Sequence, residues 1–193
     1  MAYGTISRMT ADDRKRLIRE LNGRTREIAF EAAKGICLDR EWPPSLAAPL
    51  IRTLKHGRRA LNRSAAAYTL QMVTSKETIR ALERRVSDRS EHPSVRGAAA
   101  ESLAHAHRKE SHDLLLSALE DRSREVRFWC AFSLGEMGDE RAIPTLEKLA
   151  ATDKRIVKGF HSVAQEAEDS IKNIQGHTKQ HRRKGGCIFC VKK

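Results

Sequence analysis

The sequence feature that most constrains the fold is an internal repeat. HPSVRGAAAESLAHA, residues 92–106, is similar to RSREVRFWCAFSLGE, residues 122–136, and matching positions are 31 residues apart, so that Leu103 falls on Leu134. The segments that follow match at the same offset. Periods of this length are typical of arrays of helical hairpins, in which each unit buries its apolar face only by stacking on its neighbours.

The period continues toward the N-terminus. A step of 33 residues back reaches LNRSAAAYTLQM, residues 61–72, and a further step of similar size reaches the weaker match REIAFEAAKGI, residues 26–36. Apolar residues recur at helical spacing, and no alternating β pattern interrupts them. We therefore expect an all-α chain of about four helical hairpins with one continuous core. The leucines expected to form that core are Leu70, Leu82, Leu103, Leu115, Leu134 and Leu146.

A capping helix is expected at each end of the array. Residues 10–22 begin with Thr10, a good N-cap residue, and Gly23 can end the helix. A final helix, ending before Gly176, is expected to carry one apolar stripe of Ile156, Phe160, Val163, Ala167 and Ile171. The predicted organisation is a capping helix at 1–23, the array at 24–175 and a flexible basic tail with two cysteines at 176–193.

The stretch DRSREVRFWCAFSLGEMGDERAIPTLEKLAATD, residues 121–153, resembles a HEAT-like repeat of the kind named after phycobilisome lyases. Val126-Arg127, Leu134-Gly135 and Ala142-Ile143-Pro144 carry the resemblance, which extends in weaker form over roughly residues 24–173. It implies an α-solenoid. It does not fix the function, because the family includes bilin lyase subunits, adaptors, scaffolds and domains of unrelated enzymes.

Arginine recurs at one position of successive units, and aspartate recurs where the units end. Each arginine is expected to bind the closing aspartate of a neighbouring unit, or carbonyl groups at a helix end. The alternative is that these arginines contact an acidic partner. This predicted arginine ladder consists of Arg63, Arg96, Arg127, Asp88, Asp121 and Asp153.

The net charge of +12 is concentrated at the two ends of the chain. Because the second helices of HEAT-like units usually line the concave surface, a basic cluster in the second unit is predicted to face a partner-binding groove. An acidic protein or the phosphate backbone of a nucleic acid would suit it. The alternative is a solvated face, partly neutralised by Glu77 and Glu83. The cluster consists of Arg52, Lys55, Arg58, Arg59, Arg80, Arg84 and Arg85.

The tail, residues 176–193, has no acid and no hydrophobic periodicity, so we expect it to be mobile until it meets a partner. Arg182, Arg183 and Lys184 would attract an acidic partner or an anionic membrane surface. Two thiols and two imidazoles could also complete a zinc site, but a tail with free thiols is favoured because a lone C-x-x-C pair fits many roles. The four potential ligands are His177, His181, Cys187 and Cys190.

Enzyme signatures are missing from the sequence. It has no nucleotide-binding glycine loop, no G-x-S-x-G, no H-E-x-x-H and no His-Glu dipeptide of the kind that some HEAT-like metalloenzymes use to bind iron. The aromatic residues Phe128, Trp129 and Phe132 are expected to fill core and interface.

We therefore expect a scaffold or adaptor without a cofactor that binds a protein on its concave face. Nucleic-acid binding through the basic groove and tail is the alternative, and a bilin-lyase-like role rests on the resemblance alone. No stretch approaches the roughly 20 apolar residues that a membrane-spanning helix needs. The N-terminus also lacks the apolar core of a signal peptide, so the cytosol is the expected location.

Overall fold

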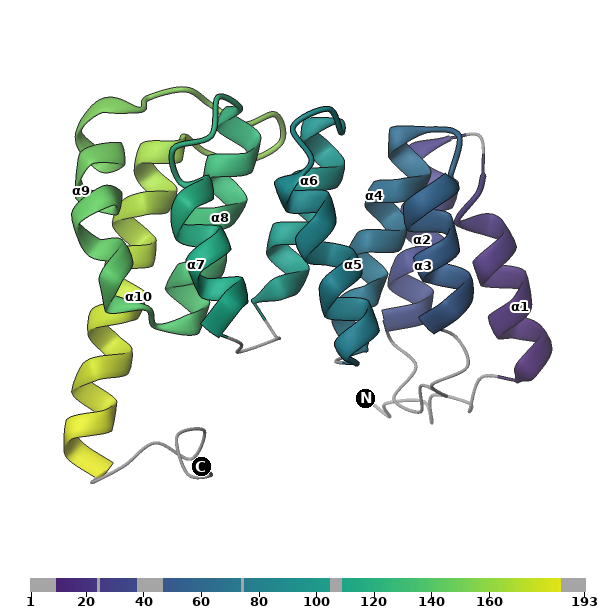
Figure 1. The fold of residues 1–193 in the computed structure, drawn as a ribbon, viewed down its shortest axis with the longest axis horizontal. Coiled ribbons are helices and arrows are strands. Elements are labelled where there is room, and N and C mark those ends of the chain that lie inside the picture. The colour runs from purple at the N-terminus through teal and green to yellow at the C-terminus, as the bar shows by residue number, and fades with distance from the viewer. Residues whose placement is uncertain (1–9, 24, 38–46, 74, 105–108, 185–193) are drawn as a thin grey trace, which may run out of the picture.

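A computed structural model describes residues 10–23, 25–37, 47–73, 75–104 and 109–184 (Figure 1). These residues form ten α-helices in a repeat-like arrangement, and α4, α6, α8 and α10 each pack closely on the helix directly before them. This arrangement confirms the predicted α-solenoid. The helices are α1 (Ala11–Glu20), α2 (Arg26–Cys37), α3 (Ala47–His56), α4 (Ala60–Thr69), α5 (Lys76–Ser87), α6 (Pro93–Leu103), α7 (Lys109–Ala118), α8 (Arg124–Met137), α9 (Ile143–Thr152) and α10 (Val163–Lys184).

The helices form two layers with the core between them. Helices α2, α4, α6, α8 and α10 make the first-helix layer, and α3, α5, α7 and α9 make the second-helix layer (Figure 1). The six leucines predicted for the core are all buried and belong to one continuous cluster. The repeat register read from the sequence is therefore correct. Among the described residues, no helix has the length and apolar character needed to cross a bilayer.

The N-terminal cap forms as expected. The hydroxyl of Thr10 accepts a hydrogen bond from the backbone N–H of Asp13 (3.1 Å), and the Asp13 carboxylate accepts one from the backbone N–H of Thr10 (3.2 Å). This reciprocal pair satisfies two backbone donors that the first turn of a helix otherwise leaves open.

Small residues bring neighbouring first helices close together. A serine hydroxyl on each of α6, α8 and α10 donates to a backbone carbonyl of the preceding first helix, at 2.9 Å in each case. These serine bridges run from Ser102 to Ala67, from Ser133 to Ala100 and from Ser170 to Ala131. A Cβ at Gly135 would lie only 2.9 Å from Ser170, so the helices touch through their backbones there. This close approach curves the array toward the first-helix layer.

The chain between α9 and α10 differs from the prediction. Ile156 and Phe160 were expected on the last helix, but they lie in a loop, residues 153–162, that precedes it. A β-bridge pairs Ile156 with Ser162, and Gly159 at the tip has a φ of +86°. The chain reverses at Gly159 because a residue without Cβ adopts this left-handed conformation without strain.

The last helix also continues past Gly176, where the sequence predicted its end, to Lys184. Gly176 is exposed, and a Cβ added there would meet no atom within 4 Å beyond its chain neighbours and its own helix backbone. A single interior glycine costs only about 1 kcal/mol of helix stability, and the lysine, glutamine and arginine residues that follow are good helix formers. The helical part of the chain therefore extends into the segment predicted to be a flexible tail.

Candidate binding surfaces

The arginines at the repeated position are buried and bind both backbone and carboxylate groups. Arg96 donates to the carboxylate of Asp121 (2.6 and 3.2 Å) and to the carbonyl of Val86 (2.9 and 3.0 Å). Arg127 donates to the carboxylate of Asp153 (2.5 and 2.8 Å) and to the carbonyl of Asp121. Each guanidinium thus joins the end of one unit to the end of the next.

The first member of the arginine ladder differs from the expected pairing. Arg63 donates to Glu91 (2.7 and 2.8 Å) and to the carbonyl of Gly57 (2.7 Å). The carboxylate of Asp88 instead accepts from the backbone N–H and the hydroxyl of Ser90, which closes a turn. The carboxylate that faces Arg63 is therefore that of Glu91, and Asp88 shapes the loop beside it.

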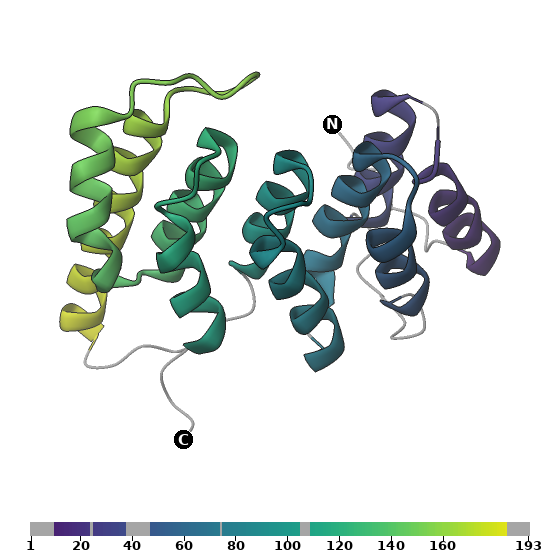
Figure 2. The same cartoon turned by 45° about the horizontal axis from the view of Figure 1, so that its top comes forward.

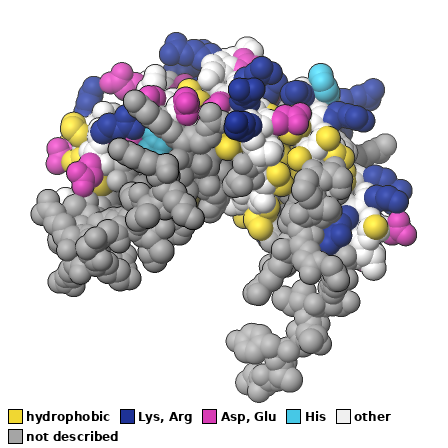
Figure 3. All heavy atoms as spheres, turned by 60° about the horizontal axis from the view of Figure 1, so that its bottom comes forward, with side chains coloured by type: hydrophobic (Ala, Val, Ile, Leu, Met, Phe, Trp, Pro, Cys, Tyr) yellow, Lys and Arg dark blue, Asp and Glu magenta, His cyan; other side chains and the backbone are white. Residues whose placement is uncertain are grey.

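The predicted basic cluster lies on the second-helix layer and the adjoining loop. Arg52 and Lys55 are on α3, Arg80 and Arg84 are on the neighbouring α5, and all four are exposed. None of these four side chains, nor exposed Arg58, forms an ion pair with another residue that the structure describes. Figure 3 shows several Lys and Arg side chains along the upper edge of the view, interspersed with Asp and Glu.

Two further members of the cluster are held by the protein. Arg85 is partly buried and lies 3.4 Å from Asp88 and 3.5 Å from Glu91. Arg59 is the N-cap residue of α4. The cluster therefore divides into five exposed cations, Arg52, Lys55, Arg58, Arg80 and Arg84, and two that take part in local structure.

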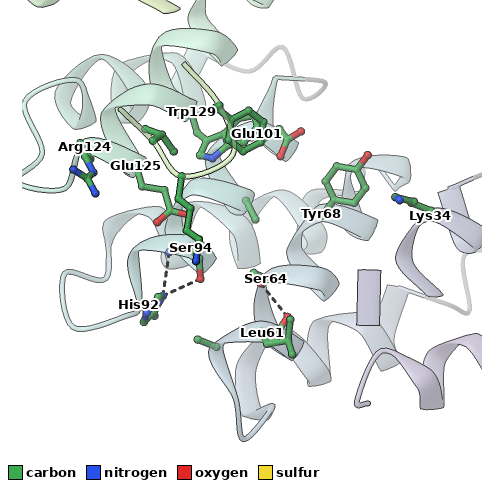
Figure 4. Close-up of a pocket in the computed structure, with 15 residues that line it drawn as sticks. Lys34, Leu61, Ser64, Tyr68, His92, Ser94, Glu101, Arg124, Glu125 and Trp129 are labelled. Atoms are coloured by element: carbon green, nitrogen blue, oxygen red, sulfur yellow. Dashed lines mark hydrogen bonds between the residues drawn. The ribbon is translucent and has the colours of Figure 1, made fainter. Parts of the chain in front are cut away.

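A hollow in the described structure lies on the opposite layer. It has a volume of about 880 Å³ and is lined by α2, α4, α6, α8 and the loop 153–162 (Figure 4). Figure 2 shows this loop reaching from the C-terminal end of the array toward its middle. The hollow therefore lies on the first-helix layer and not on the second helices, which were expected to line the concave surface; which layer binds a partner stays a prediction.

Glu101 points into this concave hollow. Its carboxylate lies beside the indole of Trp129, with the phenol of Tyr68 on its other side (Figure 4). No residue that the structure describes forms a hydrogen bond or ion pair with the side chain of Glu101. Burial raises the pKa of its carboxyl group to about 7, because the charged form loses contact with water.

Aromatic rings form the wall next to Glu101. The ring centroid of Trp129 lies 5.1 Å from that of Phe160 and 5.2 Å from that of Phe128, both edge to face. A Cβ at Gly97, one helical turn before Glu101, would lie 2.5 Å from the Trp129 ring, so the indole lies directly over α6. Phe160 is 48% exposed and supplies an apolar surface at the rim.

Sequence reasoning did not identify this hollow, although the repeat register contains a signal for it. Lys34, Tyr68 and Glu101 occupy one position in successive units, at offsets of 34 and 33 residues, and all three line the hollow. Their side chains differ in charge and size, whereas the core positions keep the same apolar type. A position that recurs in the register of the repeat, but carries a different type of side chain in each unit, indicates an exposed inner face.

The predicted tail sites fall mostly beyond what the structure describes. Cys187 and Cys190 lie outside the described residues. His177, His181, Arg182, Arg183 and Lys184 belong to α10, but their side chains are not described. Among the described residues, no group of three His, Cys, Asp or Glu side chains is placed to hold a metal ion. The zinc, membrane and electrostatic functions of the tail stay predictions.

Comparisons with known proteins agree with this architecture. Residues 86–159 match a family model described as HEAT repeats. The structure of human deoxyhypusine hydroxylase in complex with glycerol aligns with a TM-score of 0.52 and 16% identity, over 84% of this chain and 63% of the hydroxylase chain. An engineered protein aligns with a TM-score of 0.47 and 20% identity, over 86% of this chain and 80% of that chain. No curated protein matches the chain.

The family-model match and the alignment with the hydroxylase confirm the repeat architecture, and they concern the fold alone. This chain spans less than two thirds of the hydroxylase chain, and the identity is low.

Proposed function

We propose that this chain, whose residues 86–159 are HEAT repeats, is a scaffold that holds an extended segment of a partner protein in its concave hollow. The observation that carries the proposal is the hollow itself, which spans four consecutive first helices and is roofed by the loop 153–162. Its volume of about 880 Å³ is in the range that accommodates a short peptide or a small molecule.

The lining of the hollow favours a polypeptide with mixed side chains. Apolar surface from Leu61, Trp129 and Phe160 alternates with polar groups such as Ser64, Ser94 and Glu101. Protein interfaces combine aromatic anchors with a polar surround in this way. A nucleic-acid backbone would instead need a continuous row of cations, which the inner face does not provide.

Photo-cross-linking in the native host tests where the partner sits. A photoreactive residue at Lys158, exposed on the loop above the hollow, should cross-link a discrete protein in a manner resistant to nuclease. The same residue at Glu147, exposed on α9 in the second-helix layer, is the matched control. Cross-links that form from Glu147 and not from Lys158 would refute the proposed binding face.

The identified partner then allows a quantitative test. Ala60→Trp places a large ring in the hollow, whereas Ala151→Trp places the same ring on the exposed side of α9. Filling the site should weaken binding of the purified partner by at least about tenfold, equivalent to about 1.4 kcal/mol, and the control should leave it unchanged. Equal affinities of the two variants would contradict the proposal.

The five exposed cations of the basic cluster favour a second candidate function, the binding of a nucleic acid. Unlike Arg63, Arg96 and Arg127, they are exposed and form no ion pair with the described residues, so their charge is available to a polyanion. Affinity for a single-stranded oligonucleotide should then fall steeply with salt. Arg80→Ala should reduce the slope of log K against log salt by about 0.7, the value for one phosphate contact on a single strand.

Lys148→Ala on α9 removes one exposed positive charge away from the cluster and serves as the control. A slope that changes equally in both variants would mean that only net charge matters, and this candidate function would be rejected. A cytosolic location stays part of the proposal.

A further inference from the structure

The carboxylate of Glu101 is chemically unusual in its surroundings. It is partly buried in an aromatic-walled hollow, it has no partner among the described residues, and it belongs to a protein with a net charge of +12. Elsewhere in the described structure, buried carboxylates such as Glu91, Asp121 and Asp153 are paired with arginines. A desolvated carboxylate that has no counter-charge in the described part of the chain could be completed by a cation from a ligand.

The rings around Glu101 are suited to the same kind of ligand. Trp129 and Tyr68 flank the carboxylate (Figure 4), and Phe160 packs against the indole. Aromatic faces attract cations through the ring quadrupole, and tryptophan does so most strongly. A carboxylate between two aromatic rings therefore offers an ammonium or guanidinium group both a charge-assisted hydrogen bond and cation–π contacts.

Other charged groups also line the hollow. Lys34 on α2 lies next to Tyr68 (Figure 4) and forms an exposed ion pair with Glu31 at 2.8 Å. The remaining charged or titratable groups on the lining are His92 at the start of α6, Arg124 and Glu125 on α8, and Lys158 on the loop. Figure 4 shows His92, Arg124 and Glu125 apart from Glu101 and Tyr68.

We propose that Glu101, Trp129 and Tyr68 form a subsite for the cationic side chain of a lysine or arginine in the bound protein segment. This inference rests on the proposed function for the source of the cation, and it adds the chemistry by which the partner is recognised. The strongly positive chain repels cations at long range, so a cation that binds must do so through a local site such as this one.

The test uses the full-length protein and two small probes. These are Nα-acetyl-lysine methylamide and its neutral norleucine analogue, followed through the indole N–H signals in NMR spectra. The chain has two tryptophans, Trp42 and Trp129, and the signal lost in Trp129→Phe identifies the reporter. The lysine probe should shift this signal saturably, and the norleucine probe should bind at least about tenfold more weakly, a difference of one charge-assisted contact.

Two variants with the same change in charge make the test specific. Glu101→Gln keeps the shape of the side chain and should weaken lysine binding by at least about tenfold. Glu147→Gln, exposed on α9, should bind the probe as the unchanged protein does. Equal binding of the probe to the Glu101→Gln protein, or equal binding of the norleucine probe, would overturn the subsite.

Acidity gives an independent readout. With a carboxyl pKa of about 7, lowering the pH from about 8 to about 6 leaves roughly one tenth of the ionised form and should weaken lysine binding about tenfold. The Glu101→Gln protein should lose this dependence. If it persists there, it arises from another group such as His92, and the assignment to Glu101 is wrong.

Failure of this inference is distinguishable from failure of the proposed function. If the cross-linked partner occupies the hollow but binds the Glu101→Gln protein with unchanged affinity, the scaffold function stands and the subsite is refuted. If the partner never cross-links from Lys158, the scaffold function is refuted, and with it the identification of the cation as a protein side chain.

Discussion

Arg96 offers the sharpest test of how the array is held together. Its guanidinium is 4% exposed, donates to both oxygens of Asp121 and twice to the carbonyl of Val86, and so connects three elements. Arg96→Ala leaves a buried carboxylate with only the Ser123 N–H as a described donor, and leaves the Val86 carbonyl without these donors. Removing one partner of a buried ion pair costs about 3–5 kcal/mol, a large share of the 5–15 kcal/mol that typically stabilises a domain.

A milder variant and a control keep the result interpretable if Arg96→Ala fails to fold. Arg96→Lys keeps the charge but loses the planar fork, so the free energy of unfolding should fall by about 1–3 kcal/mol. Arg58→Ala removes an exposed arginine and should change it by less than about 0.5 kcal/mol. Urea unfolding followed by far-ultraviolet circular dichroism measures all three.

The loss should also depend on pH. Burial alone would raise the pKa of Asp121, but hydrogen bonds from Arg96 and from the Ser123 N–H outweigh it, and the net pKa lies below its usual value. A carboxyl group with a depressed pKa in the folded state stabilises the protein at neutral pH, and this contribution disappears as the pH falls through that pKa. The difference in the free energy of unfolding between the Arg96→Ala variant and the unchanged protein should therefore become smaller below about pH 4.

A loss under about 1 kcal/mol for Arg96→Ala would refute this account, because it would mean that the buried pair contributes little net stability. A difference in the free energy of unfolding that stayed constant across the acid range would also refute it. A variant that kept its stability but lost its partner would show instead that Arg96 contacts the partner.

Four other substitutions probe the packing and the hollow. Leu134→Ala should lower the free energy of unfolding by about 2–5 kcal/mol, because Leu134 is fully buried, and an unchanged melting temperature would contradict the repeat register. Gly135→Ala should destabilise the protein by about 1–2 kcal/mol, because the added Cβ would lie 2.9 Å from Ser170. Gly176→Ala has open space around the added Cβ and should slightly stabilise the protein. Shifts of the melting temperature in the same direction for both variants would refute the close contact at Gly135. A carboxyl group with a raised pKa stabilises the folded protein at low pH and loses this contribution as the pH rises from about 4.5 to about 7. Over that window the free energy of unfolding of the Glu101→Gln protein should therefore rise relative to that of the unchanged protein, by up to about 3 kcal/mol. A difference between the two proteins that does not depend on pH in urea titrations would contradict the burial of Glu101.

The sequence predicted the array because its repeat follows from one physical requirement. Each hairpin must present apolar residues to the next at the same register, so Leu103 and Leu134 recur at a fixed offset and both are buried. The cap at Thr10 was also predictable, since it depends only on a residue and its neighbour three positions on.

Features that depend on competition or curvature were not predictable in this way. Asp88 and Glu91 both follow α5, and spacing alone does not decide which carboxylate Arg63 reaches. Ile156 and Phe160 are four residues apart, as on a helix, but this pair is too short a pattern to exclude a loop that turns at Gly159.

The position of the hollow depends on which layer the array bends toward. That curvature is decided by backbone contacts between first helices, such as the approach of Gly135 to Ser170. A repeat register read from sequence specifies which residues are buried, but it contains no information about the spacing of the two layers. Within the basic cluster, Arg52, Lys55, Arg80 and Arg84 are exposed residues of α3 and α5, on the layer opposite the hollow, and their part in binding stays a prediction.

The arginine ladder has a consequence for how the protein opens in solution. Arg63 joins the loop after α3 to the loop after α5, Arg96 joins the end of α5 to the loop after α7, and Arg127 joins the loop after α7 to the loop after α9. A repeat unit that unfolds alone would leave a buried guanidinium or carboxylate on the neighbouring unit without its partner. Partial unfolding at each of these junctions therefore costs additional free energy. Amide hydrogens from α4 to α9 should therefore exchange with solvent together, in one cooperative event, while those of α1, to which the arginine ladder does not extend, should exchange sooner.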